Sequence, residues 1–264
     1  SFACTTWTIK MTTTLVVLAH PEPRSFNGAW ADETRRVCTA LGDTVLWSDL
    51  GTSGFDAVER ATHFGQRETG EAFDPLKAQE AAALSESLPR DVAEEIDKLK
   101  LADRVIFHFP LWWFAPPAVL KGWFDRVLAH GALHSVDRRF DNGMFLNKKA
   151  LFCVTTGCSE AESAFNGKEA DVRMLLWPSA YALRYLGFTV LQPEVVHGVH
   201  GYHTGSKKDD LQEHLSQVLA RQAGLINAFD TRREIRFNRD DDFDADGRLR
   251  PDRPSYSAFI RHES

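Results

Sequence analysis

Short apolar runs alternate along this chain with longer segments of helical periodicity, and this alternation limits the possible folds more than any other feature. Five runs have the pattern of buried strands, because each is apolar at its centre and too short for a helix. They are Thr14–His20, Thr44–Leu50, Arg104–Pro110, Ala150–Thr156 and Phe188–Val196. Strands separated by helices form βαβ units, so the pattern predicts an α/β fold: a doubly wound, five-stranded parallel sheet with helices on both faces.

The intervening segments repeat apolar residues at a spacing near 3.6, which predicts amphipathic helices. In Lys208–Phe229, for example, Leu211, Leu215 and Val218 fall on one side. The other predicted helices are Asn27–Leu41, a short one around 77–86, Asp91–Ala102, Pro117–Leu128 and Asp171–Leu186. The rest of 51–89, rich in Gly, Thr and Ala, predicts an irregular excursion.

The 264 residues suit one large domain with an extension. Met11 precedes the first predicted strand and resembles a natural start, so we expect residues 1–10 to be an N-terminal extension and 11–229 to be the domain. From about Asp230 the chain is polar, charged and contains proline. We expect residues 230–264 to form a tail that wraps a partner or the domain.

Charge and hydropathy argue against several kinds of partner. The chain has 31 Lys and Arg against 37 Asp and Glu, a net charge of −6, whereas nucleic-acid binding requires a basic face. No stretch approaches the roughly 18 apolar residues of a membrane span, and residues 1–10 lack the features of a signal peptide.

The cysteines favour a reducing, cytoplasmic setting. There are four, at positions 4, 38, 153 and 158, and they are too scattered for a disulfide framework or a zinc site. Cys153 is expected to be a buried hydrophobe. Asp242, Asp244 and Asp246 imitate the start of a calcium loop, but Arg253 stands where a bidentate Glu is needed. The segment therefore predicts an acidic turn, and no metal site is expected.

In an open parallel sheet, ligands bind beyond the carboxyl ends of the strands. The loop after the first strand is HPEPRSFN, residues 20–27. Two prolines exclude a helix there, and Ser25 and Asn27 can cap the helix that follows. Because helix N-termini bind anions, the loop is either a phosphate site or an ordinary capped turn.

The loop after the third strand is PLWWFAPP, residues 110–117. Its two tryptophans and one phenylalanine cannot all be buried on one side of a strand. They suit a rigid aromatic wall for a flat conjugated ligand. A hydrophobic plug and a dimer contact are the alternatives.

The loop after the fourth strand is TTGCSEAES, residues 155–163. Gly157 allows a ligand to approach the backbone closely, and the hydroxyl and N–H groups around it are donors. The alternative is a turn that only reverses the chain.

Common nucleotide and hydrolase motifs are missing. The chain has no G-x-G-x-x-G after the first strand and no Walker-type phosphate loop, which argues against a Rossmann dehydrogenase or a P-loop NTPase. It also has no G-x-S-x-G elbow, the usual mark of an α/β hydrolase.

Together, the three loops resemble those of the flavin-dependent NAD(P)H:quinone oxidoreductases, the DT-diaphorase family of flavodoxin-like fold. HPEPRSFN resembles that family's flavin-phosphate loop, and RVIFHFPLWWFAPPAVLKGWFDRVL resembles its isoalloxazine-binding strand, loop and helix. KKALFCVTTGCS is similar to its second flavin loop, usually Thr-Thr-Gly-Gly. The likeness runs from about Thr14 to Glu194 and implies that residues 11–229 form a flavodoxin-like flavin-binding domain.

The resemblance also implies roles for individual residues. The ribityl and phosphate end of the flavin would contact His20, Arg24, Ser25, Phe26 and Asn27. The ring would lie against Pro110, Leu111, Trp112, Trp113 and Phe114. Its pyrimidine edge would face Thr155, Thr156, Gly157, Cys158 and Ser163, with backbone N–H groups of 156–158 stabilising negative charge on the reduced ring.

Some positions depart from the family pattern. Ser163 and Glu169 stand where the best-known members have a Tyr and a His, and His134 and Val136 stand where two tyrosines occur. An adenine-side Arg has no counterpart unless Lys207 or Lys208 replaces it. His134 is either a proton donor or substrate contact, or a surface histidine, and Glu169 either orients a donor or is an exposed carboxylate at a helix start. The candidate catalytic residues are His134, Gly157, Cys158 and Glu169.

The resemblance implies an NAD(P)H-dependent enzyme that carries FAD rather than FMN and reduces quinones or related acceptors by two-electron ping-pong transfer. An azo- or nitro-aromatic reductase and a redox-sensing subunit of a potassium-efflux system are alternatives, while electron-carrying flavodoxins lack the aromatic loop. Family pockets lie between subunits, so a homodimer is expected, with Trp112, Trp123 or the tail contributing. No linear motif separates NADH from NADPH.

Overall fold

The computed structural model describes residues 11–65 and 72–263, so the extension expected over residues 1–10 lies outside the described residues. It confirms the α/β fold with a parallel sheet. Strands β1 (Thr13–Leu18), β2 (Thr44–Asp49), β3 (Arg104–Pro110) and β4 (Lys149–Thr155) agree with the predicted strands to within a residue or two. Their order in the sheet is β2-β1-β3-β4, and every pairing is parallel.

The fifth predicted strand, Phe188–Val196, is divided in two. β5 (Thr189–Val190) and β6 (Glu194–Val196) both pair with β4, so the described residues form a six-stranded sheet with five positions. Thr189 pairs with Lys149, an offset of 40, whereas Glu194 pairs with Cys153, an offset of 41. The extra residue makes a bulge, which ends at Pro193, a residue without an N–H for the ladder.

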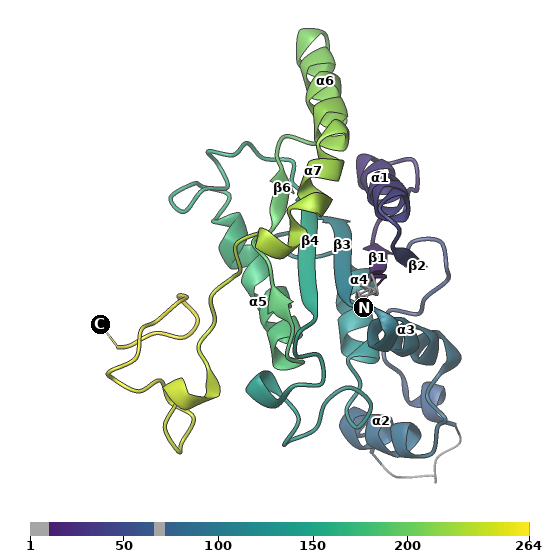
Figure 1. The fold of residues 1–264 in the computed structure, drawn as a ribbon, viewed down its shortest axis with the longest axis vertical. Coiled ribbons are helices and arrows are strands. Elements are labelled where there is room, and N and C mark those ends of the chain that lie inside the picture. The colour runs from purple at the N-terminus through teal and green to yellow at the C-terminus, as the bar shows by residue number, and fades with distance from the viewer. Residues whose placement is uncertain (1–10, 66–71, 264) are drawn as a thin grey trace, which may run out of the picture.

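Helices cover both faces of the sheet (Figure 1). On one face lie α3 (Arg90–Leu101), α4 (Ala118–Val127) and α5 (Val172–Tyr185), and on the other lie α1 (Phe26–Ala40), α6 (Ser206–Ala220) and α7 (Gln222–Asn227). The predicted helix Lys208–Phe229 is therefore two helices, which meet at Arg221. The excursion contains a 3₁₀ turn at Ala61–Phe64 and α2 (Pro75–Leu84).

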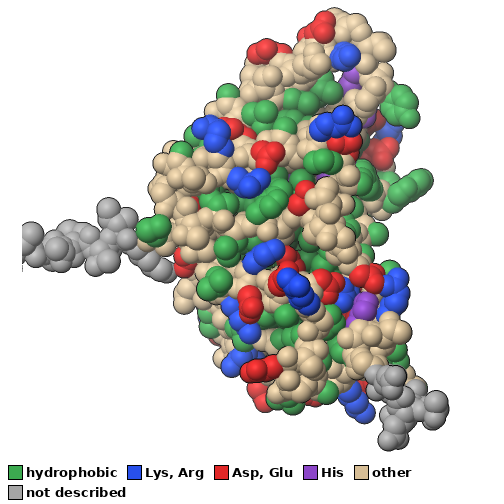
Figure 2. Space-filling model, turned by 90° about the vertical axis from the view of Figure 1, so that its right-hand side faces the viewer, with side chains coloured by type: hydrophobic (Ala, Val, Ile, Leu, Met, Phe, Trp, Pro, Cys, Tyr) green, Lys and Arg blue, Asp and Glu red, His purple; other side chains and the backbone are tan. Residues whose placement is uncertain are grey.

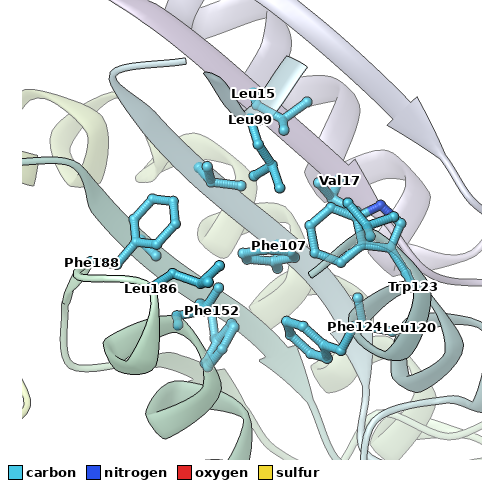
Figure 3. Close-up of a cluster of buried hydrophobic side chains, with 14 of the residues drawn as sticks. Leu15, Val17, Leu99, Phe107, Leu120, Trp123, Phe124, Phe152, Leu186 and Phe188 are labelled. Atoms are coloured by element: carbon cyan, nitrogen blue, oxygen red, sulfur yellow. The ribbon is translucent and has the colours of Figure 1, made fainter. Parts of the chain in front are cut away.

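The larger apolar core lies under α3, α4 and α5 (Figure 3). Phe107 of β3 is at its centre, with its ring centroid 5.5 Å from that of Phe152 and 5.7 Å from that of Trp123. Trp123 is fully buried and donates its indole N–H to Glu95 (2.8 Å). The expectation that Trp123 contributes to a dimer interface is therefore wrong, because this side chain is enclosed by its own chain. Cys153 is fully buried as expected, and burial raises its pKa.

A buried polar network joins α7 to α1 on the other face. Trp30 donates its indole N–H to Gln222 (2.8 Å), and Gln222 donates to the hydroxyl of Thr34 (2.7 Å). Nε2 of His108 lies 3.0 Å from the same hydroxyl. The network anchors the C-terminal helices over β3 just below the strand ends.

The tail packs against its own chain. Leu191 pairs with Glu234, and Phe237 and Phe259 both contact Trp177 of α5. In the acidic turn, the Asp244 carboxylate accepts hydrogen bonds from backbone N–H groups of residues 246 and 248. Among the described residues, no group of three or more His, Cys, Asp or Glu side chains is arranged to hold a metal ion.

Acidic and basic side chains are interspersed on the face of the molecule that Figure 2 shows, without a broad region of one sign. None of the described helices is both long and apolar enough to cross a bilayer.

Candidate functional site

The structure brings the three predicted loops together at one edge of the sheet. They follow β1, β3 and β4, which are neighbours, and side chains and backbone link them. The ring centroids of His20 and Trp112 are 5.6 Å apart, and the Leu111 N–H donates to the carbonyl of Thr155 (2.8 Å). The Thr155 hydroxyl donates to Oδ1 of Asn27 (2.9 Å).

The first loop folds back onto the start of α1. Ser25 is the N-cap and accepts the Gly28 N–H (3.1 Å). Nδ1 of His20 lies 3.0 Å from both the N–H and the carbonyl of Glu22. Gly28 is required by packing, because a Cβ there would lie 2.0 Å from the carbonyl oxygen of Pro23. The loop is therefore a capped turn whose backbone packs closely against the N-terminus of α1.

Two side chains of this loop that were predicted to contact the flavin already contact other residues of the chain. The exposed Arg24 guanidinium makes two hydrogen bonds to Glu22, at 2.9 and 3.0 Å, and lowers the pKa of that carboxyl to about 2. Phe26 stacks on Trp30 with a centroid distance of 5.6 Å. The structure therefore shows Arg24 paired with a neighbour and Phe26 packed against the core.

Asn27 is the polar side chain of the first loop with unused capacity. It is 3% exposed, and its amide nitrogen Nδ2 has no hydrogen-bond partner within the part of the chain that the structure describes. An unpaired buried donor costs about 1–3 kcal/mol. An acceptor atom of a ligand at the N-terminus of α1 would remove that cost.

The second loop is a tight turn whose aromatic side chains are exposed. Trp112 and Ala115 exchange two backbone hydrogen bonds, at 2.9 and 3.1 Å. Between them, Trp113 has a φ of 51° and Phe114 a φ of 63°, the left-handed region that a type I′ turn needs at both central positions. Such a conformation costs roughly 1–2 kcal/mol for each non-glycine residue. Trp113 is 93% exposed, so the plug interpretation is wrong, and a ligand wall and a dimer contact remain.

The third loop, the second loop and the start of α5 enclose a cavity of about 290 Å³. It is lined by most of the residues predicted for the ring and its edge, which are Leu111, Trp113, Phe114, Thr156, Gly157, Cys158 and Ser163. The candidate catalytic residue Glu169 also lines it, together with Val172 and Leu175. Glu169 is the charged side chain of this lining. The space beside Gly157 is open, because a Cβ added there would meet no atom within 4 Å.

The backbone donors of the third loop differ in availability. The Thr156 N–H donates to the carbonyl of Val196 (3.0 Å), so the expectation that it stabilises negative charge on a ligand is wrong. The N–H groups of Gly157 and Cys158 make no hydrogen bond to any described residue, and both residues line the cavity. The Cys158 thiol lies 3.0 Å from the Thr156 hydroxyl.

The structure does not bring His134 to this cavity. Its Nε2 lies 3.0 Å from the carbonyl of Leu128, and its ring lies between His130 and Tyr185. Burial is the main cause that lowers its pKa. The turn at 130–134 directs the ring beneath α5, and Val136 borders a separate cavity of about 620 Å³ between residues 136–142 and the tail.

Sequence reasoning missed His197. It follows β6 directly, and its Nδ1 lies 3.0 Å from the hydroxyl of Ser163, which is 3% exposed. The signal was present in the sequence, since residues just beyond a strand are the informative ones. Its contact with Ser163 depends on the tertiary structure, because β6 pairs with β4 and so brings residue 197 beside the loop that follows β4.

The donors and surfaces of the site suit a flavin. Nδ2 of Asn27 is free for an oxygen acceptor, and the N–H groups of Gly157 and Cys158 are free for the polar edge of a ring. The exposed side chains of Trp112 and Trp113 can cover a flat aromatic system.

Comparisons with known proteins agree with this geometry. The family described as "Flavodoxin-like fold" matches residues 12–221. NAD(P)H dehydrogenase [quinone] 1 of Rattus norvegicus is 38% identical over 187 residues, covering 70% of this chain and 68% of the relative. Ribosyldihydronicotinamide dehydrogenase [quinone] of Homo sapiens is 38% identical over 185 residues, covering 69% of this chain and 79% of the relative.

Among solved structures, a putative quinone reductase from Klebsiella pneumoniae superposes with a TM-score of 0.80 at 31% identity, covering 91% of this chain and 94% of that one. The converging loops and these relationships lead to one conclusion. The chain belongs to the flavin-dependent NAD(P)H:quinone oxidoreductase family of flavodoxin-like fold.

Proposed function

We propose that this protein is an NAD(P)H-dependent flavoprotein that reduces quinones or related flat aromatic acceptors by two electrons, with FAD as its cofactor. The observation that supports this most directly is the cavity of about 290 Å³, which is lined by exposed aromatic residues and by two residues whose backbone N–H groups are free. When bound, the flavin takes a hydride from NAD(P)H and passes two electrons to the acceptor.

The first loop is proposed to hold the ribityl and phosphate end. Asn27 would donate through Nδ2, with the N-terminus of α1 attracting the phosphate. Ser25 contributes by capping the helix and His20 by positioning Trp112. Arg24 is proposed to contribute less to phosphate binding than expected, because its guanidinium would first have to break its hydrogen bonds to Glu22.

The second and third loops are proposed to hold the ring. Trp112, Trp113 and Phe114 would cover it, with Pro110 and Leu111 supporting the turn at the end of β3. The free N–H groups of Gly157 and Cys158 would stabilise negative charge at the polar edge of the reduced ring, as preorganised donors do. Thr155 would act through Asn27, whose amide its hydroxyl orients.

NAD(P)H and the quinone are proposed to bind in the same cavity one after the other. A cavity of about 290 Å³ accommodates few ring systems at once, so the nicotinamide has to leave before the acceptor enters. We expect parallel lines in double-reciprocal plots of initial rate against both substrates. Intersecting lines would show that both are bound together.

FAD is favoured over FMN because α6 and α7 continue the domain beyond the sheet, where an adenine could be covered. Lys207 and Lys208 stand in the first turn of α6 and are exposed. Mass spectrometry of the compound released on denaturation distinguishes FAD from FMN.

We propose that the protein functions as a homodimer in the cytoplasm, with residues 11–229 as the flavin-binding domain and the tail near the interface. The exposed Trp112 and Trp113 support a second subunit over the site. Size-exclusion chromatography with light scattering tests this, and a monomer in the flavin-loaded state would contradict it.

The function itself is tested by the absorbance spectrum of the purified protein and by its oxidation of NAD(P)H with a simple quinone. If azo or nitro compounds are turned over faster than quinones, the proposed acceptor is wrong and such a compound takes its place. Flavin binding without turnover would favour a redox-sensing role. A colourless protein that binds neither FAD nor FMN would exclude the proposal.

A further inference from the structure

Ser163 and His197 form a hydrogen-bonded pair between two cavities. Ser163 lines the inner cavity of about 290 Å³, which also contains Gly157 and Cys158. Together with His197 it also lines an outer cavity of about 380 Å³, which contains Glu160 and Phe165 of the loop at 159–170. The Ser163 hydroxyl and Nδ1 of His197 are 3.0 Å apart, so one hydrogen bond connects the two spaces.

The proposed quinone reduction consumes a proton, and a catalytic role for this pair rests on that proposed function. In NAD(P)H + H⁺ + quinone → NAD(P)⁺ + hydroquinone, the nicotinamide C–H bond breaks, and its hydride supplies two electrons and one hydrogen. The second acceptor oxygen needs a proton from solvent. Ser163 lines the inner cavity, and its hydroxyl is hydrogen-bonded to a histidine that lines the outer cavity, so this pair is placed to supply the proton.

We propose that Ser163 and His197 form a proton path that delivers this proton from the outer to the inner cavity. When Nδ1 of His197 carries a proton, it donates to Oγ of Ser163. The Ser163 hydroxyl proton, which otherwise points to the carbonyl of Ser159 (3.0 Å), is then free to move into the inner cavity.

As the Ser163 proton leaves, Oγ takes the proton of Nδ1, and His197 becomes neutral. Water in the outer cavity reprotonates the imidazole, and tautomer exchange or ring rotation returns the N–H to Nδ1. His197 acts through Ser163 and is therefore a positioning residue, whereas Ser163 is the group that reaches the reacting atoms.

The surroundings of His197 favour release of a proton. Burial is the largest cause lowering its pKa, His214 lowers it further, and Glu160 opposes both. A histidine with a lowered pKa gives up its proton more readily than a free imidazolium does. The charged and titratable groups around it are Glu160, Asp171, Arg173 and Glu194 in the outer cavity and His214 on α6.

The first test is the pH profile of kcat with NAD(P)H and a neutral quinone. Because the pKa of His197 is below 6.5, kcat of the wild-type enzyme should fall as the pH rises through a midpoint below 6.5. His197→Asn keeps a polar group near Nδ1 but cannot titrate. We expect kcat to fall about 10-fold to 100-fold with KM unchanged and with that inflection lost. His200→Asn, an exposed histidine on the same loop, should keep the wild-type profile.

The second test does not depend on turnover. The NMR signals of His197 in the purified protein report its titration midpoint and tautomer, and Ser163→Ala should shift both. His200→Asn should shift neither. This measurement keeps the proposal falsifiable even if His197→Asn fails to fold.

The outcomes separate two failures. If the wild-type enzyme turns over and His197→Asn retains its kcat and pH profile, the proton path is wrong and the proposed function stands. The path is also wrong if the titration midpoint and tautomer of His197 are the same in Ser163→Ala as in the wild-type protein. If the wild-type protein binds no flavin or oxidises no NAD(P)H, the proposed function fails, and the path fails with it.

Discussion

The buried network between α1 and α7 and the site at the strand ends contain similar residues. They differ in how far the hydrogen-bonding groups of those residues are paired. In the network, Trp30, Thr34 and Gln222 are hydrogen-bonded to one another and almost completely buried, and only Nδ1 of His108 lacks a partner among the described residues. At the site, Trp113 is exposed in a left-handed turn, and Asn27 holds a buried donor without a partner among the described residues. The first arrangement stabilises the chain by itself, whereas the second is completed only by a ligand or a partner.

The largest effect is expected from breaking the network. Gln222→Leu leaves the Trp30 N–H without its buried acceptor and should lower the free energy of unfolding by about 2–4 kcal/mol. Flavin affinity of the folded fraction should not change. Urea denaturation with a parallel flavin titration checks both, and Gln217→Leu on the exposed face of α6 is the control. Equal losses in the two variants would mean that the network contributes nothing specific.

The opposite pattern is expected for Asn27→Leu. The change removes the unpaired donor and leaves the Thr155 hydroxyl without an acceptor, so stability should fall by only about 1 kcal/mol. Loss of a hydrogen bond to a phosphate oxygen should weaken flavin binding about 10-fold to 100-fold. Fluorescence titration of the flavin-free protein measures this, with the exposed Asn227→Leu as control. Unchanged affinity would remove Asn27 from the proposed site.

A smaller effect concerns the charge of the inner cavity. Glu169 is its charged lining residue, and one charge at close range contributes about 1 kcal/mol in a partly hydrated site. Glu169→Gln should therefore raise kcat/KM for a quinone carboxylate or sulfonate about fivefold and leave a neutral quinone unchanged. Glu162→Gln, which loses an ion pair with Lys168 outside this lining, is the matched control. The same increase for neutral and anionic acceptors would contradict the charge effect.

The smallest effect tests the strained turn. Trp113→Gly relieves a left-handed conformation worth roughly 1–2 kcal/mol, offset by about 0.5–1 kcal/mol of glycine entropy. The flavin-free protein should thus gain about 0.5–1 kcal/mol while its flavin affinity falls. Tyr202→Gly removes a similarly exposed ring outside the residues of left-handed φ and should not stabilise the protein. A loss of stability in Trp113→Gly would show that this ring is packed in solution.

Local patterns predicted β1, β3 and β4, because a buried central strand is a continuous apolar run whatever lies around it. The same patterns misjudged residues 188–196, where a one-residue bulge depends on pairing with β4. They also misjudged Trp123, whose spacing on α4 is compatible with a surface or a core. Its complete burial follows from contacts with Phe107 and Glu95, residues distant in sequence.

The site shows the same division. Its residues from the three loops could be named because each follows a strand, and the order of strands then placed the loops together. His134 was a candidate because of the family resemblance alone, but the turn at 130–134 directs its ring toward Tyr185. His197 and the engaged N–H of Thr156 became visible only with β6 in place.

By itself, the sequence determined the α/β class, the central strands and the loops that carry the chemistry, since hydrophobic periodicity and turn residues act over a few neighbouring positions. The tertiary structure decided which donors stay free, which rings are exposed and which histidine meets Ser163. Those properties depend on atoms that are close in space but distant along the chain, and no local pattern contains them.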